Sequence, residues 1–274
     1  MGLMAREIIQ TVAALQTAGE AFVVATVVRT VSVTAAKAGA KAVIQADGTI
    51  SEGWIGGGCA RGAVVRAARD ALSDGQSRLI SVSPEEALAA QGVRPGEVRD
   101  GVQFARSMCP SKGTMDIFIE PVLPKPELIV CGVSPVALAL LALGPTFGFS
   151  VLASAAAEDM TMYPQGLRTA ADYAIPCGNA ERYIVVATQG RSDEVALRAA
   201  LTTPATYRAF VGSRAKTAAV SARMRDVPTD AVTALHAPAG LDLGAITPEE
   251  IALSILAQMV AHRRQGQRKA PERP

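Results

Sequence analysis

The chain contains few aromatic residues, few histidines and no marked excess of charge. Aromatic residues make up 4% of its 274 residues, and the net charge is +2. This near balance gives no reason to expect a nucleic-acid partner. The two histidines, His236 and His262, are expected in a loop and in solvent, respectively. So few histidines disfavour a hydrolase triad and a histidine-rich metal site.

Long apolar runs and closely spaced cysteines are also missing. No apolar run reaches the length that spans a bilayer, and the N-terminus lacks the apolar region of a signal peptide. We therefore expect a cytoplasmic protein. The four cysteines lie far apart and form no C-x-x-C pair. In a reducing compartment this spacing excludes a disulfide framework and disfavours zinc, so each cysteine is considered separately.

The high content of aliphatic residues favours a large core built from small aliphatic side chains. Hydrophobic residues make up 49% of the chain and charged residues only 19%, and a chain of this length accommodates two domains. The segment Leu123-Pro124-Lys125-Pro126 predicts a stiff, extended linker. We expect one domain over residues 1–122, a second over residues 127–262, and a basic, disordered tail over residues 263–274.

The first half predicts an N-terminal α/β domain. Helical periodicity predicts a helix over residues 5–18, and the segment that follows the glycine run predicts another over residues 59–72. Strands are predicted over residues 22–28, 41–45, 78–82 and 114–122, with a hairpin turn at Asp47-Gly48. The segment Ser83-Pro84-Glu85-Glu86 predicts a helix start with Ser83 as the N-cap.

The second half predicts a Rossmann-like, doubly wound parallel sheet. Short apolar strands, over residues 128–131, 149–152, 183–187 and 207–211, alternate with helices over residues 136–143, 193–201 and from 214 onward. This alternation is typical of parallel sheets covered by helices. The segment Thr247-Pro248-Glu249-Glu250 has the pattern of a capping box and predicts a last helix to about residue 261.

The most informative motif is Gly56-Gly57-Gly58-Cys59, which lies where a hairpin leads into a helix. Glycines allow the backbone to approach a ligand closely, and their N–H groups can converge on an anion. A cysteine at a helix start is favoured as the thiolate by the helix dipole. The sequence therefore indicates an anion site beside a reactive sulfur. The alternative is a tight turn with a small, buried packing thiol.

The other cysteines lie in different settings. Cys109 lies in a polar loop with Lys112, whose ammonium could stabilise a thiolate or hold an anion. The alternative is an incidental loop cysteine. Cys131 ends an apolar strand, which predicts a buried structural thiol, and Cys177 suggests no chemistry.

The turn after residues 128–131 resembles the dinucleotide fingerprint only in part. Gly132 and Ala137 fit the pattern, but Ser134 replaces the middle glycine and Pro135 lacks an N–H group. The acidic residue expected after the second strand is absent from residues 153–156. Usual NAD binding is therefore disfavoured, whereas FAD or another adenine nucleotide could use the crevice.

Further turns of the second half could contribute to that crevice. Thr188 follows the strand over residues 183–187, and Gly212 and Ser213 lie between a strand and a helix that carries Lys216. Backbone N–H groups at such a helix start can bind a phosphate. A solvated helix start is the alternative. The predicted nucleotide contacts are Gly132, Ser134, Thr188, Gly212 and Ser213.

Several of these segments together resemble the XdhC/CoxI family of molybdenum-enzyme maturation factors. The resemblance covers nearly the whole chain and is carried by residues 25–29, 53–59, 118–121, 187–190, 211–216 and, most specifically, 240–252. Ala60-Arg61 and the loop over residues 108–113 are most similar to the CoxF-like branch, which is associated with CO dehydrogenase. In the xanthine dehydrogenase branch an acidic residue is usual near position 61, and many relatives have Gly-Ala-Gly-His where this chain has Gly132-Val133-Ser134-Pro135.

The resemblance implies that the protein binds molybdenum cofactor and helps to equip it with sulfur before insertion into a molybdenum hydroxylase. In the CO dehydrogenase branch it also implies copper. Gly56, Gly57, Gly58 and Lys112 would hold the cofactor, and Cys59 and Cys109 would handle sulfur or metal. The expected partners are the client subunit and other maturation proteins, with a homodimer as a further expectation.

Two other classes of function stay open at this stage. One is a nucleotide-dependent oxidoreductase that uses FAD or NAD(P), which the Rossmann-like alternation favours. The other is a non-catalytic scaffold that only docks onto its client.

Overall fold

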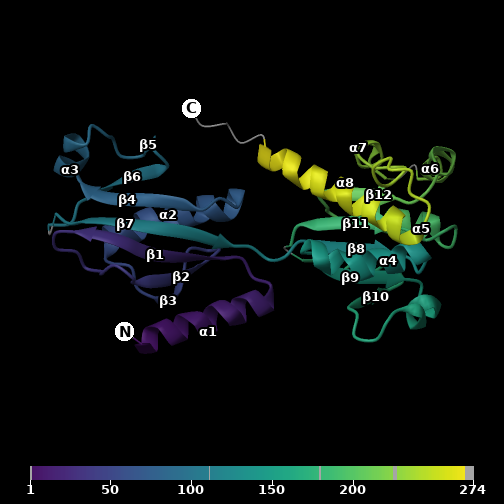
Figure 1. Ribbon diagram of the computed structural model, residues 1–274, viewed down its shortest axis with the longest axis horizontal. Helices are drawn as coiled ribbons and strands as arrows, with labels where there is room; N and C mark the ends of the chain where they lie inside the picture. Colours follow the sequence, from purple (N-terminus) through teal and green to yellow (C-terminus); the bar gives the residue numbers. More distant parts are fainter. Residues whose placement is uncertain (1, 111, 179, 225–226, 269–274) are drawn as a thin grey trace. The chain divides into compact units, whose positions relative to one another are not determined.

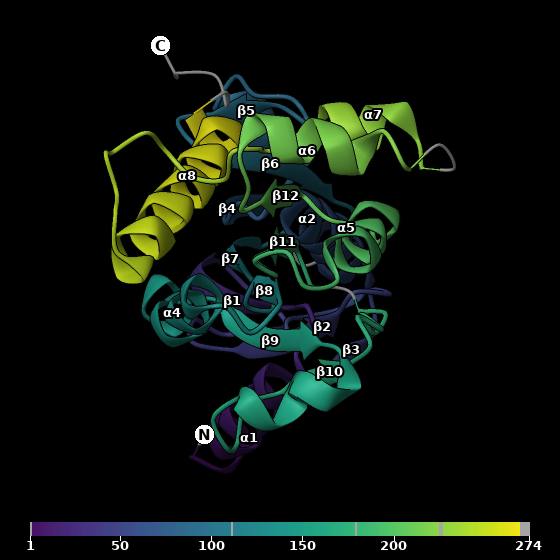
Figure 2. The same cartoon turned by 90° about the vertical axis from the view of Figure 1, so that its right-hand side faces the viewer.

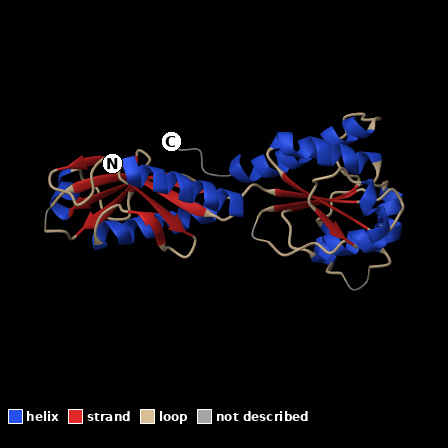
Figure 3. Cartoon of the chain, turned by 90° about the horizontal axis from the view of Figure 1, so that it is seen from below, coloured by secondary structure: helices blue, strands red, loops and turns tan. Residues whose placement is uncertain are grey.

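A computed structural model describes residues 2–110, 112–178, 180–224 and 227–268. The chain divides into two compact units, Met1–Pro124 and Lys125–Pro274, and the boundary falls inside the predicted linker (Figure 1). Each unit consists of a sheet with helices packed on it (Figure 3). Among the described helices, none combines the length and the apolar character that a membrane crossing requires.

The first unit is built on a seven-stranded mixed sheet with the order β3-β2-β1-β7-β4-β6-β5. Its strands are β1 (Phe22–Val31), β2 (Lys41–Gln45), β3 (Ile50–Gly53), β4 (Arg78–Pro84), β5 (Val98–Arg99), β6 (Val102–Ser107) and β7 (Thr114–Val122). Its helices are α1 (Gly2–Ala18), α2 (Gly58–Asp74) and α3 (Glu85–Ala90). The helices and strands predicted for this half are thus present, with β2 and β7 at the predicted bounds.

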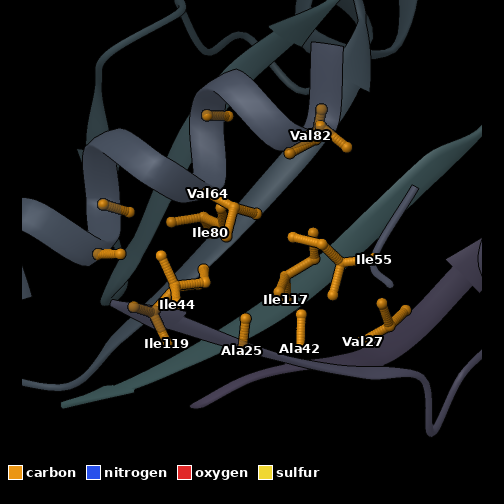
Figure 4. Packing of buried hydrophobic residues seen from close by; sticks show 14 of the residues in the cluster. Ala25, Val27, Ala42, Ile44, Ile55, Val64, Ile80, Val82, Ile117 and Ile119 are labelled. Atoms are coloured by element: carbon orange, nitrogen blue, oxygen red, sulfur yellow. The ribbon is translucent and has the colours of Figure 1, made fainter. Parts of the chain in front are cut away.

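The core of this unit lies between α2 and one face of the sheet (Figure 4). Alternate residues of β7, among them Ile117 and Ile119, point to that face and are fully buried. Val64 of α2 packs into the same cluster. A smaller cluster, in which Ile8 of α1 meets Phe22 and Val43, joins α1 to the sheet.

The region around Ser83 differs from the prediction. Strand β4 continues to Pro84, which is itself the N-cap of α3, and no side chain caps that helix. The hydroxyl of Ser83 lies 3.2 Å from that of Ser81 instead. The strand extends because β6, which the sequence did not predict, pairs with β4 in parallel up to Pro84 and Ser107.

The second unit contains a five-stranded, wholly parallel sheet with the order β10-β9-β8-β11-β12, which is the predicted Rossmann-like arrangement (Figure 2). Its strands are β8 (Glu127–Cys131), β9 (Ser150–Ala155), β10 (Thr169–Ala171), β11 (Arg182–Val186) and β12 (Tyr207–Phe210). Its α-helices are α4 (Pro135–Leu143), α5 (Asp193–Thr202), α6 (Arg214–Ser221), α7 (Thr229–Thr233) and α8 (Pro248–Arg268), and its 3₁₀ helices are η1 (Gly144–Phe147) and η2 (Ala157–Met162).

Both faces of this sheet are covered, as a parallel sheet requires. Helices α4 and α8 pack on one face, and α5 packs on the other. Residues of β8 and β11 therefore alternate between two apolar clusters, with Val130 in the first and Ile129 in the second.

The last helix begins at the predicted capping box but ends later than predicted. The Thr247 hydroxyl accepts a hydrogen bond from the Glu250 N–H, and the Glu250 carboxylate accepts one from the Thr247 N–H. The helix extends to Arg268, so residues 263–268 are helical, whereas residues 269–274 lie outside the described part. In this last part of the helix, the Arg263 guanidinium lies 5.6 Å from the centre of the Phe149 ring.

His262 is a further correction, since it was expected in solvent. Its ring packs edge-on against Tyr207 and His236, with ring centres 5.7 Å apart in each pair. His236 stacks on Tyr207 at 4.6 Å, so the two histidines of the chain share one aromatic cluster.

Candidate functional site

The glycine–cysteine loop over residues 56–59 leads directly into α2. Gly57 is the N-cap of that helix, and no side chain accepts a hydrogen bond there. The first backbone N–H groups of an α-helix have no acceptor within the helix. The start of α2 therefore presents N–H groups together with the positive end of the helix dipole, which suits an anion.

The three glycines of this loop differ in whether the fold leaves room for a side chain at their position. Gly56 is buried, has a φ of 117°, and a Cβ there would lie 3.2 Å from Cε of Met115. At Gly57 and Gly58, which are exposed, a Cβ would meet no atom within 4 Å. The fold thus requires glycine at position 56 but not at positions 57 and 58, where the missing side chains leave the backbone open to a ligand.

Cys59 is the second residue of α2, as the prediction of a thiol at a helix start requires. Its side chain lies outside the part that the structure describes. The reactivity of its sulfur therefore stays a prediction.

Cys109 lies in the loop between β6 and β7, and its side chain is exposed. Its N–H donates a hydrogen bond to the Ser107 hydroxyl over 3.2 Å. Met115 follows this loop on β7 and also borders Gly56. The fold therefore brings the Cys109 loop and the glycine–cysteine loop to the same end of the sheet, although 50 residues separate the two cysteines.

Lys112 lies beside Cys109, because its N–H donates to the Cys109 carbonyl oxygen over 3.1 Å, and its side chain forms an ion pair. Its ammonium lies 2.7 Å from the Glu86 carboxylate, and both side chains are exposed. The hydrogen bond between them raises the pKa of Lys112 and lowers the pKa of Glu86. The nearest charge partner that the structure describes for this ammonium is thus a carboxylate of α3.

Cys131 is a buried thiol, as predicted. It is fully buried, and burial raises its pKa to about 12. Such a thiol is unreactive at neutral pH. Cys177, by contrast, is exposed.

The second candidate site lies at the carboxyl edge of the parallel sheet. The chain order reverses between β8 and β11, and ligands of such sheets bind at this switch point. The segments that follow β8, β11 and β12 all leave the sheet at this edge. The fold therefore brings together the predicted residues Gly132, Ser134, Thr188, Gly212 and Ser213.

The turn after β8 is tightly packed. Gly132 has a φ of 117°, and a Cβ there would lie 2.6 Å from the carbonyl oxygen of Ala187. The Ser134 hydroxyl accepts a hydrogen bond from the Ala137 N–H and so caps α4. The Tyr163 hydroxyl donates to the Gly132 carbonyl oxygen over 2.8 Å. The Ser134 hydroxyl and the Gly132 carbonyl oxygen thus both have hydrogen-bond partners within the protein.

The turn after β12 is built in a similar way. The Ser213 hydroxyl accepts a hydrogen bond from the Lys216 N–H and caps α6. A Cβ at Gly212 would lie 2.8 Å from the Phe210 ring. Contact with the Phe210 ring therefore explains why position 212 is a glycine.

Asp193, which was not among the residues predicted for this site, joins the turns after β11 and β12. Its carboxylate accepts hydrogen bonds from the Thr188 hydroxyl and the Gly190 N–H, and the Lys216 ammonium lies 2.7 Å away. Burial opposes its ionisation, but the bonds from Lys216, Thr188 and Gly190 outweigh burial and lower the pKa of Asp193. The signal in the sequence was an acidic residue at the start of a helix, five residues after Thr188.

A second ion pair crosses the same edge of the sheet. Asp159 of η2 follows β9 and lies 3.5 Å from the Arg191 guanidinium. Residues 153–156, where the fingerprint would place an acidic group, contain none. The carboxylate lies four residues beyond the end of β9, because a 3₁₀ helix replaces the usual turn.

Fold and sites define a two-domain α/β protein, in which one unit carries a glycine–cysteine loop and the other a Rossmann-like sheet. Two family models match it: "XdhC and CoxI family" over residues 15–83 and "XdhC Rossmann domain" over residues 128–259. Together they cover most of the chain. The chain belongs to the XdhC and CoxI family.

Individual relatives are more distant. The uncharacterized protein YqeB of Escherichia coli K12 is 27% identical over an alignment of 234 residues, and the alignment covers 81% of this chain. The chain spans 40% of the length of that relative. A crystal structure described as a xanthine dehydrogenase from Bacillus halodurans matches 97% of this chain and 98% of its own, with 18% identity and a TM-score of 0.45.

Proposed function

We propose that this protein is a cytoplasmic maturation factor for a molybdenum hydroxylase and that the glycine–cysteine loop holds the anionic molybdenum cofactor. The observation that carries the proposal is the uncapped start of α2, where Gly57 and Gly58 have no steric reason to be glycine. An anion can approach the N–H groups there without meeting a side chain. Membership of the XdhC and CoxI family supports the same function.

Within this proposal, Cys59 and Cys109 handle sulfur or copper for the client. Cys59 lies in the first turn of α2 and Cys109 in the loop before β7, at the same end of the first sheet. Soft thiolate ligands suit Cu(I) as well as sulfur transfer. CO dehydrogenase is the proposed client, because Arg61 and the loop around Cys109 are similar to the CoxF-like branch.

The test is to mature the client enzyme with altered forms of this protein. In Cys59→Ala and Cys109→Ala we expect the client to contain normal polypeptide but less sulfur or copper at its molybdenum site. Cys177→Ala is the matched control, because Cys177 is an exposed cysteine in the other unit. Full loading of the client by both test variants would remove the proposed roles of the thiols.

A second candidate function is a nucleotide-dependent oxidoreductase that uses FAD or NAD(P). The switch point between β8 and β11 favours it, because dinucleotides bind there in such sheets. The turn after β8 counts against it, because the Gly132 N–H that a pyrophosphate would need already donates to the Ser154 carbonyl oxygen over 2.8 Å. A visible absorption spectrum and titrations with FAD and NAD(P)H separate the two functions. In the maturation proposal, the same crevice takes a nucleotide or the dinucleotide part of the cofactor.

A further inference from the structure

The segment over residues 241–246, which precedes α8, is tied to that helix at both of its ends. The Leu241 N–H donates a hydrogen bond to the Ser254 carbonyl oxygen over 3.2 Å. The Ile246 N–H donates to the Glu250 carboxylate over 2.8 Å. Figure 2 shows this segment running along the outside of the second unit before α8 begins. The segment is therefore held in place by the first two turns of the helix.

This segment and the start of α8 expose several large apolar side chains. We define the apolar patch as Leu241, Leu243, Ile246 and Leu253, which are between 41% and 85% exposed. Among the described residues of the second unit, the other large apolar side chains that are exposed are Met162 and Val195. Exposed apolar side chains that gather in one place indicate a contact surface.

Ile246 is an apolar residue that the fold of its own unit does not use. It precedes Thr247, whose hydroxyl caps α8, and an apolar residue in that position often packs against the fourth residue of the helix. That residue, Ile251, packs instead into the apolar cluster between α8, α4 and the sheet. Ile246 is 85% exposed, so its side chain is available to a partner.

The apolar patch has an acidic border. Residues 240–256 include Asp242, Glu249 and Glu250, all of them exposed, and contain no Lys, Arg or His. Protein interfaces have a polar rim, and charges across them are complementary. A partner that fits this patch therefore presents apolar side chains bordered by lysine or arginine. The same patch of a second copy does not fit, because it would place like charges opposite each other.

We propose that the apolar patch docks onto the client enzyme, at a face where apolar side chains are bordered by lysine or arginine. This inference rests on the proposed function, since it takes the molybdenum hydroxylase client as the partner. A maturation factor has to hold its client while the cofactor passes between them. In this proposal the first unit carries the glycine–cysteine loop, and the second unit contributes the docking surface.

Binding of the purified full-length protein to the purified client, prepared without its cofactor, tests the proposal. Leu243→Ser and Ile246→Ser should each raise the Kd of this complex about tenfold, because each removes an apolar side chain that docking would bury. Isothermal titration calorimetry measures the change. Val195→Ser is the matched control, because it removes an exposed apolar side chain from α5, on the other face of the sheet.

The acidic border is tested by a charge reversal. Asp242→Lys should lower the rate at which the protein associates with the client, and salt should lower that rate for the unaltered protein. Glu158→Lys is the control, because it reverses an exposed acidic residue of η2 outside the patch. Biolayer interferometry at several salt concentrations measures these rates.

Docking and cofactor handling are separated by the loading of the client. Cys59→Ala and Cys109→Ala should bind the client with unaltered affinity, although they load it poorly. Leu243→Ser and Ile246→Ser should load the client poorly at low concentration and normally at high concentration, because mass action offsets weak docking.

Unchanged client binding by both serine variants would overturn this inference and leave the proposed function standing. A complete lack of binding by the unaltered protein would overturn both. The inference also fails if the serine variants lose affinity for FAD or NAD(P)H instead of the client, since the patch would then belong to a nucleotide site. Far-UV circular dichroism establishes that each variant is folded, and the altered side chains are exposed.

Discussion

The hydroxyl of Tyr163 donates a hydrogen bond to the carbonyl oxygen of Gly132 over 2.8 Å, which ties the end of η2 to the turn after β8. Tyr163 is 8% exposed, and its ring belongs to the apolar cluster between α4 and the sheet. A contact between residues 31 positions apart thus fixes the turn after β8 at the carboxyl edge of the parallel sheet.

Removal of this hydroxyl should loosen that closure. In Tyr163→Phe the Gly132 carbonyl oxygen loses its donor, so we expect the free energy of unfolding to fall by about 1 kcal/mol. Urea denaturation of the variant measures this loss. Met162→Leu, at an exposed neighbouring residue, should leave stability unchanged. Equal stability of Tyr163→Phe and the unaltered protein would mean that the bond contributes nothing.

The glycines at the start of α2 allow function to be separated from folding. Gly58→Ala should keep or raise stability by about 0.5–1 kcal/mol, because alanine is the better helix former and the added Cβ meets no atom. If an anion binds there, the same change should reduce cofactor loading of the client.

Gly56→Ala, unlike Gly58→Ala, should destabilise the fold. Its positive φ and the nearby Met115 should lower stability by about 1–3 kcal/mol, measured by thermal unfolding. A Gly58→Ala protein that is as stable as expected and loads the client fully would argue against an anion site at this helix.

Asp193 should stabilise the carboxyl edge of the parallel sheet. Asp193→Asn weakens the bonds to Lys216 and Thr188, so we expect a loss of about 1–3 kcal/mol at neutral pH. The lowered pKa of Asp193 means that this stability is present above its unfolded pKa, near 3.8, and is lost as the pH falls through the folded value.

Urea denaturation at neutral and acidic pH tests this expectation. Glu194→Gln is the control, because Glu194 is the next residue of α5 and forms a partly exposed pair with Arg198, at 3.4 Å, of a kind that contributes little to stability. A loss in Asp193→Asn no greater than that in the control would show that the network is not stabilising.

His236 should make the second unit sensitive to mild acid. Burial and then the nearby His262 lower its pKa below the ordinary 6.5. The unfolded chain therefore binds a proton more readily than the folded one, so stability falls as the pH drops below about 6.5. Thermal unfolding of His236→Gln should show a weaker dependence on pH in this range. An unchanged pH profile would exclude His236 as the cause.

The elements that the sequence predicted well are those with local signals. The alternation of β7, the buried run of β8 that ends at Cys131, and the capping box at Thr247 each lie within one short segment. Hydrophobic periodicity and helix capping depend on residues that are close together in the chain. A single sequence therefore suffices to detect them. The parallel sheet followed from the alternation of such segments with helices.

The misses lie where distant segments meet. Strand β6 exists because it pairs with β4, the Ser83 cap was displaced by the same pairing, and His262 is held by Tyr207, 55 positions away in the chain. Asp193 acquired its partners only when β11 and β12 placed two turns together. The contacts of β6, Ser83 and His262 have no signal within their own segments, and the local signal of Asp193 was limited to its place at a helix start.

For the candidate site, the sequence by itself determined the chemistry: three glycines, a cysteine at a helix start, and a second cysteine in a polar loop. The tertiary structure decided which of these residues lie close together in space. It brought the Cys109 loop to the end of the sheet where α2 begins, and it turned Ser134 into a helix cap. The division is physical, because backbone preference acts over a few residues, whereas burial and pairing join positions that the chain order keeps apart.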